Sequence, residues 1–124
     1  TPAFISYGDN NRTQMIRTAG PGHVEDRTVS AGCNPYLGLA AYLAAGLDGV
    51  ENSLALPDAS TAPYASDGPP LPTNLGASIA ALDNSSFFRS AFGNAFVDYY
   101  VHPKDRGVES LPSHGVPVGV RRVL

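Results

Sequence analysis

Short apolar runs separated by turn-forming residues open the chain. Residues 3–7 (AFISY) favour a strand and stop at residues 8–11 (GDNN), which favour a tight turn. A second strand is predicted over residues 12–17 (RTQMIR) and a third over residues 23–29 (HVEDRTV), with the breaker AGPG at residues 19–22 between them. The pattern therefore predicts three short strands before any helix.

Polar side chains occupy one face of the predicted third strand. Because side chains alternate along a strand, His23, Glu25 and Arg27 share a face, and Val24 and Asp26 share the other. A carboxylate can bind a hard metal ion, and a guanidinium can grip a carboxylate or phosphate in two places. Such groups suit phosphoryl transfer, which needs negative charge neutralised. A surface cross-strand pair is the alternative reading.

Arg12 and Arg17 are further candidates for contacting phosphate. They lie five positions apart, so a regular strand would send them to opposite faces unless a bulge intervenes. Two solvated arginines are the alternative. His23 could be a ligand or a nucleotide contact, or only an exposed histidine.

A helix is predicted to start at Asn34 and Pro35. Asparagine caps free N–H groups, and proline at the first helical position loses no hydrogen bond. Residues 35–45 (PYLGLAAYLAA) are apolar almost all round, which suits a helix buried between other elements. Gly46 or Gly49 is expected to end it.

The second half of the chain predicts a loop and then two terminal helices. Residues 56–72 hold five prolines and no regular period, so we expect a long Pro-rich surface loop. Thr73 is expected to cap the next helix, and apolar and aromatic residues then recur at helical spacing: Leu75, Ile79 and Leu82, then Phe88, Phe92, Phe96 and Tyr100. The fold class is α+β, with about three strands followed by three helices.

Composition narrows the functional classes. The chain has 124 residues, a net charge of −3 and 15% charged residues, which gives no basic field for nucleic acid. The single Cys33 forms no internal disulfide, and no apolar run is long enough to cross a membrane. We therefore expect a cytoplasmic protein with neither nucleic acid nor membrane as a partner.

Three segments together resemble the glutamine synthetase family: residues 11–17 (NRTQMIR), 23–27 (HVEDR) and 33–52 (CNPYLGLAAYLAAGLDGVEN). Their order and spacing also match. The resemblance identifies residues 1–104 as the C-terminal part of a glutamine synthetase catalytic domain, hence part of a distorted barrel. The sequence of residues 10–28 further resembles that of type III glutamate–ammonia ligases and glutamate–methylamine ligase-like enzymes.

The resemblance implies a role for each candidate residue. Glu25 matches a carboxylate that binds the divalent metal, and Arg27 matches an arginine that contacts glutamate and the group being transferred. Arg12 matches the arginine that steadies the phosphoryl group and γ-glutamyl phosphate, and Arg17 matches one that contacts nucleotide phosphates. His23 stands where many members have a nucleotide-binding arginine, and it is kept as a candidate nucleotide contact.

The reaction implied by the resemblance has two steps. ATP phosphorylates the γ-carboxylate of glutamate, and ammonia or a small amine then displaces the phosphate, with Mg²⁺ or Mn²⁺ as cofactor. The family's other metal ligands lie upstream of the position matching Thr1, so the isolated chain is expected to be inactive. Its expected partners are the rest of the synthetase chain and the subunits of a homo-oligomeric ring. Two alternatives stay open: a non-catalytic module docking on an intact synthetase, and a stand-alone phosphate- or amino-acid-binding domain.

Residues 105–124 lack any apolar period and scatter Pro and Gly directly after a well-patterned helix. Read one nucleotide out of register, permitted codons for these residues can encode a peptide resembling the family's C-terminal helix. We hypothesise a frameshift after Lys104, which would make residues 105–124 an aberrant tail. A natural divergent tail is the alternative.

Overall fold

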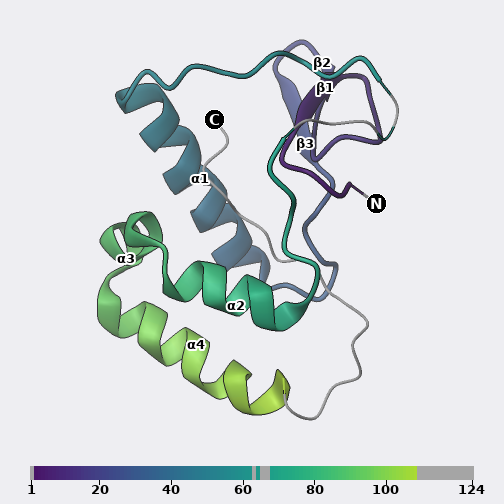
Figure 1. Ribbon diagram of the computed structural model, residues 1–124. Coiled ribbons are helices and arrows are strands. Elements are labelled where there is room, and N and C mark those ends of the chain that lie inside the picture. Colours follow the sequence, from purple (N-terminus) through teal and green to yellow (C-terminus); the bar gives the residue numbers. More distant parts are fainter. Residues whose placement is uncertain (1, 63, 65–67, 109–124) are drawn as a thin grey trace. The chain divides into compact units, whose positions relative to one another are not determined.

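The computed structural model in Figure 1 describes residues 2–62, 64 and 68–108, with only the backbone of residues 103–108. These residues fall into two compact units that divide after Leu71. The first unit holds a three-stranded sheet and one long helix, and the second holds three helices. The α+β class is thereby confirmed, with four helices in place of the predicted three.

The sheet consists of β1 (Tyr7–Asp9), β2 (Ile16–Gly20) and β3 (His23–Asp26), in that spatial order. β1 pairs with β2 in parallel, and β2 pairs with β3 antiparallel. In the second pair Arg17 lies opposite Glu25. The sheet therefore brings together two charged residues that are eight positions apart in the chain.

The strand boundaries differ from the sequence predictions. β1 begins at Tyr7 and not at residue 3, and Phe4 makes only an isolated bridge with Pro70. β2 begins at Ile16 because the Asn11 carboxamide accepts hydrogen bonds from the Thr13 N–H and hydroxyl at 3.0 and 2.7 Å, which fixes a turn. β3 ends at Asp26, four residues long and not seven.

A small core and a close backbone approach stabilise the sheet unit. Met15, Ile16 and Leu71 are buried together, and Ile5 and Tyr7 pack against them. At Gly8 a Cβ would lie 2.7 Å from the Ser60 carbonyl oxygen, so only glycine lets that segment approach β1.

The segment around Ser60 is part of the predicted Pro-rich loop. The Ser60 N–H donates to the Tyr7 carbonyl at 2.8 Å, and the buried Gln14 side chain donates to the Ala62 carbonyl at 3.2 Å. Apart from the bridge at Pro70, the described residues of 56–72 contain no helix or strand. Because residues 63 and 65–67 lie outside the described part, the loop as a whole stays a prediction.

Helix α1 spans Pro35–Glu51 and starts where the sequence predicted. The Asn34 side chain accepts from the Tyr36 N–H at 3.0 Å. The predicted end at Gly46 or Gly49 is wrong, since the helix continues to Glu51. Gly49 is buried, so a packed position outweighs the roughly 1 kcal/mol cost of a helical glycine.

The second unit consists of α2 (Leu75–Asp83), α3 (Ser86–Phe92) and α4 (Asn94–Val108). Its core is a cluster of aliphatic side chains from α2 and α4: Leu75, Ile79, Leu82, Val97 and Val101. Asn74 caps α2 through the Ala77 N–H at 2.8 Å, so the prediction of Thr73 as the cap is wrong.

The predicted aromatic helix is divided in two at Gly93. This glycine has φ +86, a left-handed conformation that ends α3 before α4 begins. The rings nevertheless follow one another at 5.7 to 5.9 Å across the break: Phe88, Phe92, Phe96 and Tyr100. The α4 backbone continues through Val108, and residues 109–124 of the predicted tail lie outside the described residues.

None of the helices in the described part of the chain has the length and apolarity needed to cross a membrane.

Candidate functional site

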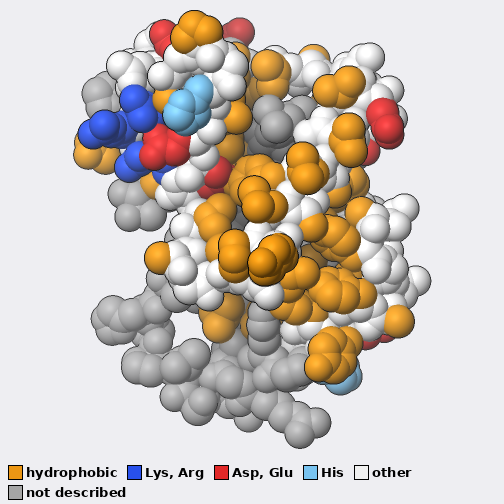
Figure 2. Space-filling view, turned by 180° about the vertical axis from the view of Figure 1, so that it is seen from behind, with side chains coloured by type: hydrophobic (Ala, Val, Ile, Leu, Met, Phe, Trp, Pro, Cys, Tyr) orange, Lys and Arg blue, Asp and Glu red, His pale blue; other side chains and the backbone are white. Residues whose placement is uncertain are grey.

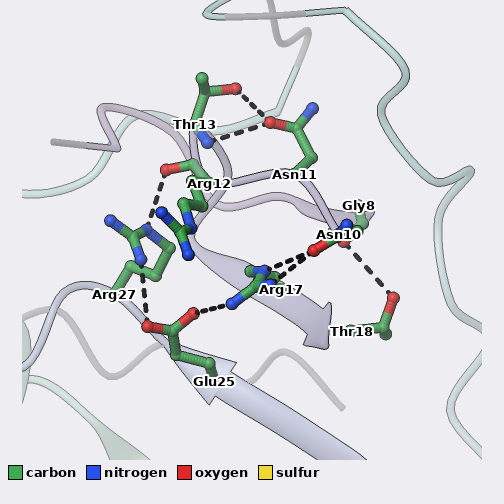
Figure 3. A network of polar contacts seen from close by, with 9 residues as sticks. All are labelled: Gly8, Asn10, Asn11, Arg12, Thr13, Arg17, Thr18, Glu25 and Arg27. Atoms are coloured by element: carbon green, nitrogen blue, oxygen red, sulfur yellow. Dashed lines mark hydrogen bonds and ion pairs between the residues drawn. The ribbon is translucent and has the colours of Figure 1, made fainter. Parts of the chain in front are cut away.

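Glu25 on β3 bridges two arginines, as Figure 3 shows. Its Oε2 lies 3.0 Å from Nη1 of Arg17, and its Oε1 lies 3.0 Å from Nη1 of Arg27. Arg17 lies on β2, directly opposite Glu25 in the antiparallel pair. Arg27 follows Glu25 by two positions, so its side chain lies on the same face of the sheet as that of Glu25. One carboxylate therefore fixes two guanidinium groups.

Each of these arginines has a second anchor. Arg27 Nε donates to the Arg12 carbonyl at 2.8 Å, which ties the end of β3 to the turn before β2. Arg17 Nε donates to the Asn10 carboxamide oxygen at 3.1 Å. Asn10 itself has φ 46, in the left-handed region that asparagine tolerates, and lies directly after β1.

Arg12 contributes a third guanidinium on the same side of the sheet (Figure 3). Its side chain is exposed, and among the described residues it has no hydrogen-bond or ion-pair partner. Because Arg12 lies in a turn and not in a strand, the expected opposite placement of Arg12 and Arg17 does not apply. Figure 2 shows basic side chains gathered around an acidic one on this part of the surface.

The cluster carries more positive than negative charge. Three guanidinium groups accompany one carboxylate, and the side chains of Arg17 and Glu25 are 17% and 37% exposed. The hydrogen bond from Arg17 lowers the pKa of Glu25 most, desolvation opposes this, and the charge of Arg27 lowers the pKa further. Glu25 is therefore ionised at neutral pH, and the excess positive charge is available to an anion.

Pre-oriented guanidinium groups of this kind bind carboxylates and phosphates. Arg17 and Arg27 are held by neighbours, so binding costs little further side-chain ordering. Arg12 is exposed and can turn toward a ligand. The arrangement suits an anion with several oxygens, such as a phosphoryl group.

The described residues do not form a metal site on their own. No three His, Cys, Asp or Glu residues cluster within the part of the chain that the structure describes. Both Glu25 oxygens already contact arginines, and a divalent hard cation needs six or so oxygen ligands. Glu25 can supply at most one carboxylate to a site whose other ligands lie elsewhere.

The structure thus brings together the four residues proposed from sequence on one side of the sheet: Arg12, Arg17, Glu25 and Arg27. His23 is exposed on β3, with no hydrogen-bond partner among the described residues, so its role stays a prediction. The sequence reading missed Asn10, which was assigned only to a turn. An asparagine in a turn after a strand is common, and nothing in the sequence indicated that its side chain would contact an arginine seven residues later.

Comparison with known proteins agrees with this geometry. Residues 1–122 match the family model described as the glutamine synthetase catalytic domain. The chain belongs to the glutamine synthetase family. This family of ligases generally uses ATP and divalent metals.

Individual family members match most of the chain. The glutamate–methylamine ligase of Methyloversatilis universalis is 39% identical over 129 aligned positions, covering 88% of this chain and 29% of the ligase. The glutamine synthetase of Mycolicibacterium smegmatis is 32% identical over 144 positions, covering 99% of this chain and 31% of the synthetase.

Solved glutamine synthetase-like structures confirm the fold. Structures of GmaS without ligand and in complex with ADP both superpose with a TM-score of 0.77, at 30% and 29% identity. Each match covers 90% of this chain and 28% of GmaS. The chain therefore has the fold of part of a glutamine synthetase catalytic domain and spans less than a third of the length of these relatives.

Proposed function

We propose that this chain supplies the arginine-rich part of the active site of an ATP-dependent ligase. That ligase joins ammonia or a small amine to the γ-carboxylate of glutamate through γ-glutamyl phosphate. The observation that carries the proposal is the Glu25 carboxylate holding Arg17 and Arg27 at 3.0 Å each, beside the exposed Arg12. Membership of the glutamine synthetase family supports this choice among anion-binding functions.

The proposed roles follow from the charges. In the first step the γ-carboxylate of glutamate attacks the γ-phosphorus of ATP, and ADP leaves. Negative charge on the transferred phosphoryl group is neutralised by Arg12 and Arg27, while Arg17 contacts the nucleotide phosphates. His23, exposed on the same strand as Glu25, is a further candidate for a nucleotide contact.

In the second step the amine nitrogen attacks the acyl carbon, the nitrogen loses a proton, and phosphate leaves. Arg12 and Arg27 stay bound to the departing phosphate and stabilise its charge. Arg27 also binds the glutamate. The M. universalis relative is a glutamate–methylamine ligase, which supports a small amine as an acceptor alongside ammonia.

Glu25 has two proposed roles. It orients Arg17 and Arg27, and it gives one oxygen to a Mg²⁺ or Mn²⁺ ion whose other ligands come from the rest of the enzyme. The bound metal would supply further neutralisation of phosphate charge. Because the described residues do not complete that site, we propose that the isolated chain does not turn over.

The working enzyme is proposed to be a larger protein. The chain spans 29% of the M. universalis ligase and 28% of GmaS, so the remaining ligands and the partner subunits of a homo-oligomeric ring come from outside it. The same proposal places the ligase in the cytoplasm. It also keeps residues 105–124 as an aberrant tail outside the functional part, as the lost periodicity predicts.

A chimera tests the proposal. The matched segment of the M. universalis ligase is replaced by residues 1–104, and amide formation is followed with ATP, Mg²⁺, glutamate and methylamine or ammonia. We expect turnover by the chimera and a loss of at least about 100-fold in kcat/KM for Arg12→Ala and Arg27→Ala, as for other groups that stabilise transition-state charge. Arg12→Lys and Arg27→Lys keep the positive charge but lose the planar guanidinium fork. Their kcat/KM should lie between that of the alanine variants and that of the unaltered chimera.

Two results would contradict the proposal. One is an active chimera whose activity survives Arg12→Ala and Arg27→Ala. The other is ligase turnover by the isolated chain under the same conditions, since that would mean that the described residues suffice.

A second candidate function is a non-catalytic module that docks on an intact synthetase. The observation favouring it is the apolar outer face of α1, where Leu43 and Leu47 are both exposed. Co-purification of the chain with assembled synthetase rings would support this candidate. A chain that never associates with intact rings speaks against it.

A further inference from the structure

Two sets of contacts hold the turn that carries Arg12. In the first, Nε of Arg27 donates to the Arg12 carbonyl at 2.8 Å. In the second, the side chains of the next two residues contact a part of the Pro-rich loop that lies 48 and 51 positions later, called the 60–64 segment here after its described residues 60–62 and 64. The Arg12 side chain is exposed and has no hydrogen-bond partner among the described residues, so the backbone of this turn determines where its guanidinium can reach.

The Thr13 hydroxyl is the centre of the second set. It donates to the Asn11 carboxamide oxygen at 2.7 Å and accepts from Nε2 of Gln14 at 3.0 Å. It also accepts from the Tyr64 N–H at 3.2 Å. A hydroxyl has one donor and two acceptor sites, so all of its hydrogen-bonding capacity is used. Figure 3 shows Thr13 bonded to Asn11 beside Arg12. The residue directly after Arg12 is thereby joined to the 60–64 segment.

The Gln14 amide makes another connection to this segment. Its side chain is buried, and Nε2 donates to the Ala62 carbonyl at 3.2 Å as well as to Thr13. Its Oε1 is also buried and has no hydrogen-bond partner among the described residues. An unsatisfied buried acceptor destabilises a fold, and an apolar side chain of similar size would avoid that cost. What the amide contributes in return is the link between the Arg12 turn and the 60–64 segment.

The backbone of the segment is shaped to make these contacts. A Cβ at Gly8 would lie 2.7 Å from the Ser60 carbonyl oxygen and 3.1 Å from Cγ of Gln14, so β1, the turn and the segment converge there. Tyr64 has φ 58, a left-handed conformation that is costly for a large side chain. Its N–H is the group that reaches the Thr13 hydroxyl. The segment therefore keeps an unfavourable backbone conformation at the residue that contacts the Arg12 turn.

We infer that Thr13 and Gln14 are positioning residues, which place Arg12 in the candidate site by tying its turn to the 60–64 segment. The inference rests on the proposed function, in which Arg12 neutralises charge on the phosphoryl group being transferred. A misplacement of about 1 Å at a catalytic site can cost about 100-fold in rate. Because Arg12 is proposed to act on the transition state, loosening of its turn should lower kcat and leave the KM for ATP and for glutamate nearly unchanged.

Thr13→Val in the ligase chimera tests the inference, because valine keeps the shape of threonine and lacks the hydroxyl. We expect kcat to fall by about tenfold or more. Thr13→Ser restores the hydroxyl and should recover most of the lost kcat, and Gln14→Met, which removes the amide at similar volume, should also lower kcat.

Thr18→Val is the matched control for Thr13→Val. The Thr18 hydroxyl donates to Asp9 and Gly8 and not to the Arg12 turn, so we expect kcat to be unchanged. Undiminished kcat in Thr13→Val, or an equal loss of kcat in Thr13→Val and Thr18→Val, overturns the inference.

A double-mutant cycle separates the positioning of Arg12 from a general loosening of the fold. If Thr13 acts through Arg12, then Thr13→Val lowers kcat no further once Arg12→Ala has been made. An equal loss in both backgrounds overturns the inference while the proposed function stands, because Arg12→Ala has by itself reduced kcat/KM. Undiminished activity of Arg12→Ala contradicts the proposed function, and the inference fails with it.

Hydrogen exchange at residue resolution checks the physical link in the same chimera. The Tyr64 N–H belongs to an exposed residue, and we expect its protection to depend on the Thr13 hydroxyl. This amide should exchange severalfold faster in Thr13→Val and at an unchanged rate in Thr18→Val. If the Tyr64 amide exchanges equally fast in Thr13→Val and in the unaltered chimera, the 60–64 segment is not tied to the turn through Thr13, and the inference is overturned.

Discussion

Arg17 and Glu25 face each other across the antiparallel pair of β2 and β3, with Nη1 of Arg17 3.0 Å from Oε2 of Glu25. The second carboxylate oxygen holds Arg27 at the same distance. A negative group at the centre of an otherwise cationic cluster keeps the guanidinium groups from repelling one another. It also makes their arrangement dependent on the protonation of one residue.

That dependence gives a prediction for acid pH. The pKa of Glu25 is lowered from the ordinary value of 4.5, mainly by the hydrogen bond from Arg17. A carboxyl group with a depressed folded pKa contributes stability above its unfolded value and loses that contribution as pH falls through the folded pKa. We therefore expect the cluster to persist at neutral pH and to loosen only below pH 4.5.

Carboxyl-carbon NMR of Glu25 checks this, with the urea-unfolded chain as the reference. The titration midpoint of Glu25 should lie lower in the folded chain than in the unfolded chain. In Glu25→Gln the acid sensitivity of the cluster should disappear, because the glutamine has no charge to lose. A Glu25 midpoint in the folded chain at or above the midpoint in the unfolded chain would contradict the ion pairs.

The close approach at Gly8 gives a prediction for stability. In Gly8→Ala the new Cβ would lie 2.7 Å from the Ser60 carbonyl oxygen, which belongs to the backbone and cannot turn away. Overpacking of this kind costs about 1–3 kcal/mol, so the free energy of unfolding should fall by that amount. Urea unfolding followed by circular dichroism measures it.

Gly32→Ala is the matched control for Gly8→Ala. There the nearest atom to the new Cβ is Ser30 Oγ at 3.7 Å, an ordinary contact, and we expect little change in stability. If both substitutions shift the urea midpoint equally, then the approach of Ser60 to β1 does not constrain the fold.

The helical unit depends on Arg89 in α3. Its guanidinium pairs with Asp83 at the end of α2 and lies 2.8 Å from the Asp98 carboxylate in α4. The hydrogen bond to Asp98, opposed by desolvation and helped by Asp83, raises the pKa of Arg89, so the charge is fully retained. One side chain thus links three helices.

Replacing Arg89 should lower the thermal midpoint of the unit in a defined order. Arg89→Lys keeps the charge but cannot reach both carboxylates and the Asp83 carbonyl as a planar fork can. We expect Arg89→Ala to melt lowest and Arg89→Lys to lie between it and the unaltered chain. Added salt should narrow the differences, and the same melting order at high and low salt would argue against an electrostatic link.

Features that depend on neighbouring residues were predictable from the sequence, and features that depend on tertiary packing were not. The start of α1 was predicted because Asn34 and Pro35 act within one helical turn. Its end was missed because the burial of Gly49, a tertiary effect, overrides the helix-breaking tendency of glycine. The sequence predicted two terminal helices and missed the break at Gly93, because the aromatic spacing continues through it.

The same distinction holds at the candidate site. Alternation along one strand predicted that Glu25 and Arg27 would meet, and their side chains are in contact at 3.0 Å. The contact of Arg17 with Glu25 depends on the register between β2 and β3. That register depends on the turn that the hydrogen bonds of the Asn11 side chain fix before β2. The sequence therefore did not decide which face of the sheet Arg17 lies on. It assigned Asn10 only to a turn and gave it no part in the candidate site.

Asn10 gives the last prediction, for activity. Its carboxamide oxygen accepts from Arg17 Nε at 3.1 Å, so we expect Asn10 to be a positioning residue for the proposed nucleotide contact. Because Asn10 has φ 46, glycine can keep the backbone while removing the carboxamide. In the ligase chimera, Asn10→Gly should raise the KM for ATP by about tenfold or more, because the hydrogen bonds from Nε and Nη2 of the charged Arg17 to the carboxamide oxygen are lost. The KM for glutamate should change little. An equal rise in both constants, or a loss of thermal stability in place of a kinetic effect, would assign Asn10 to the fold and not to Arg17.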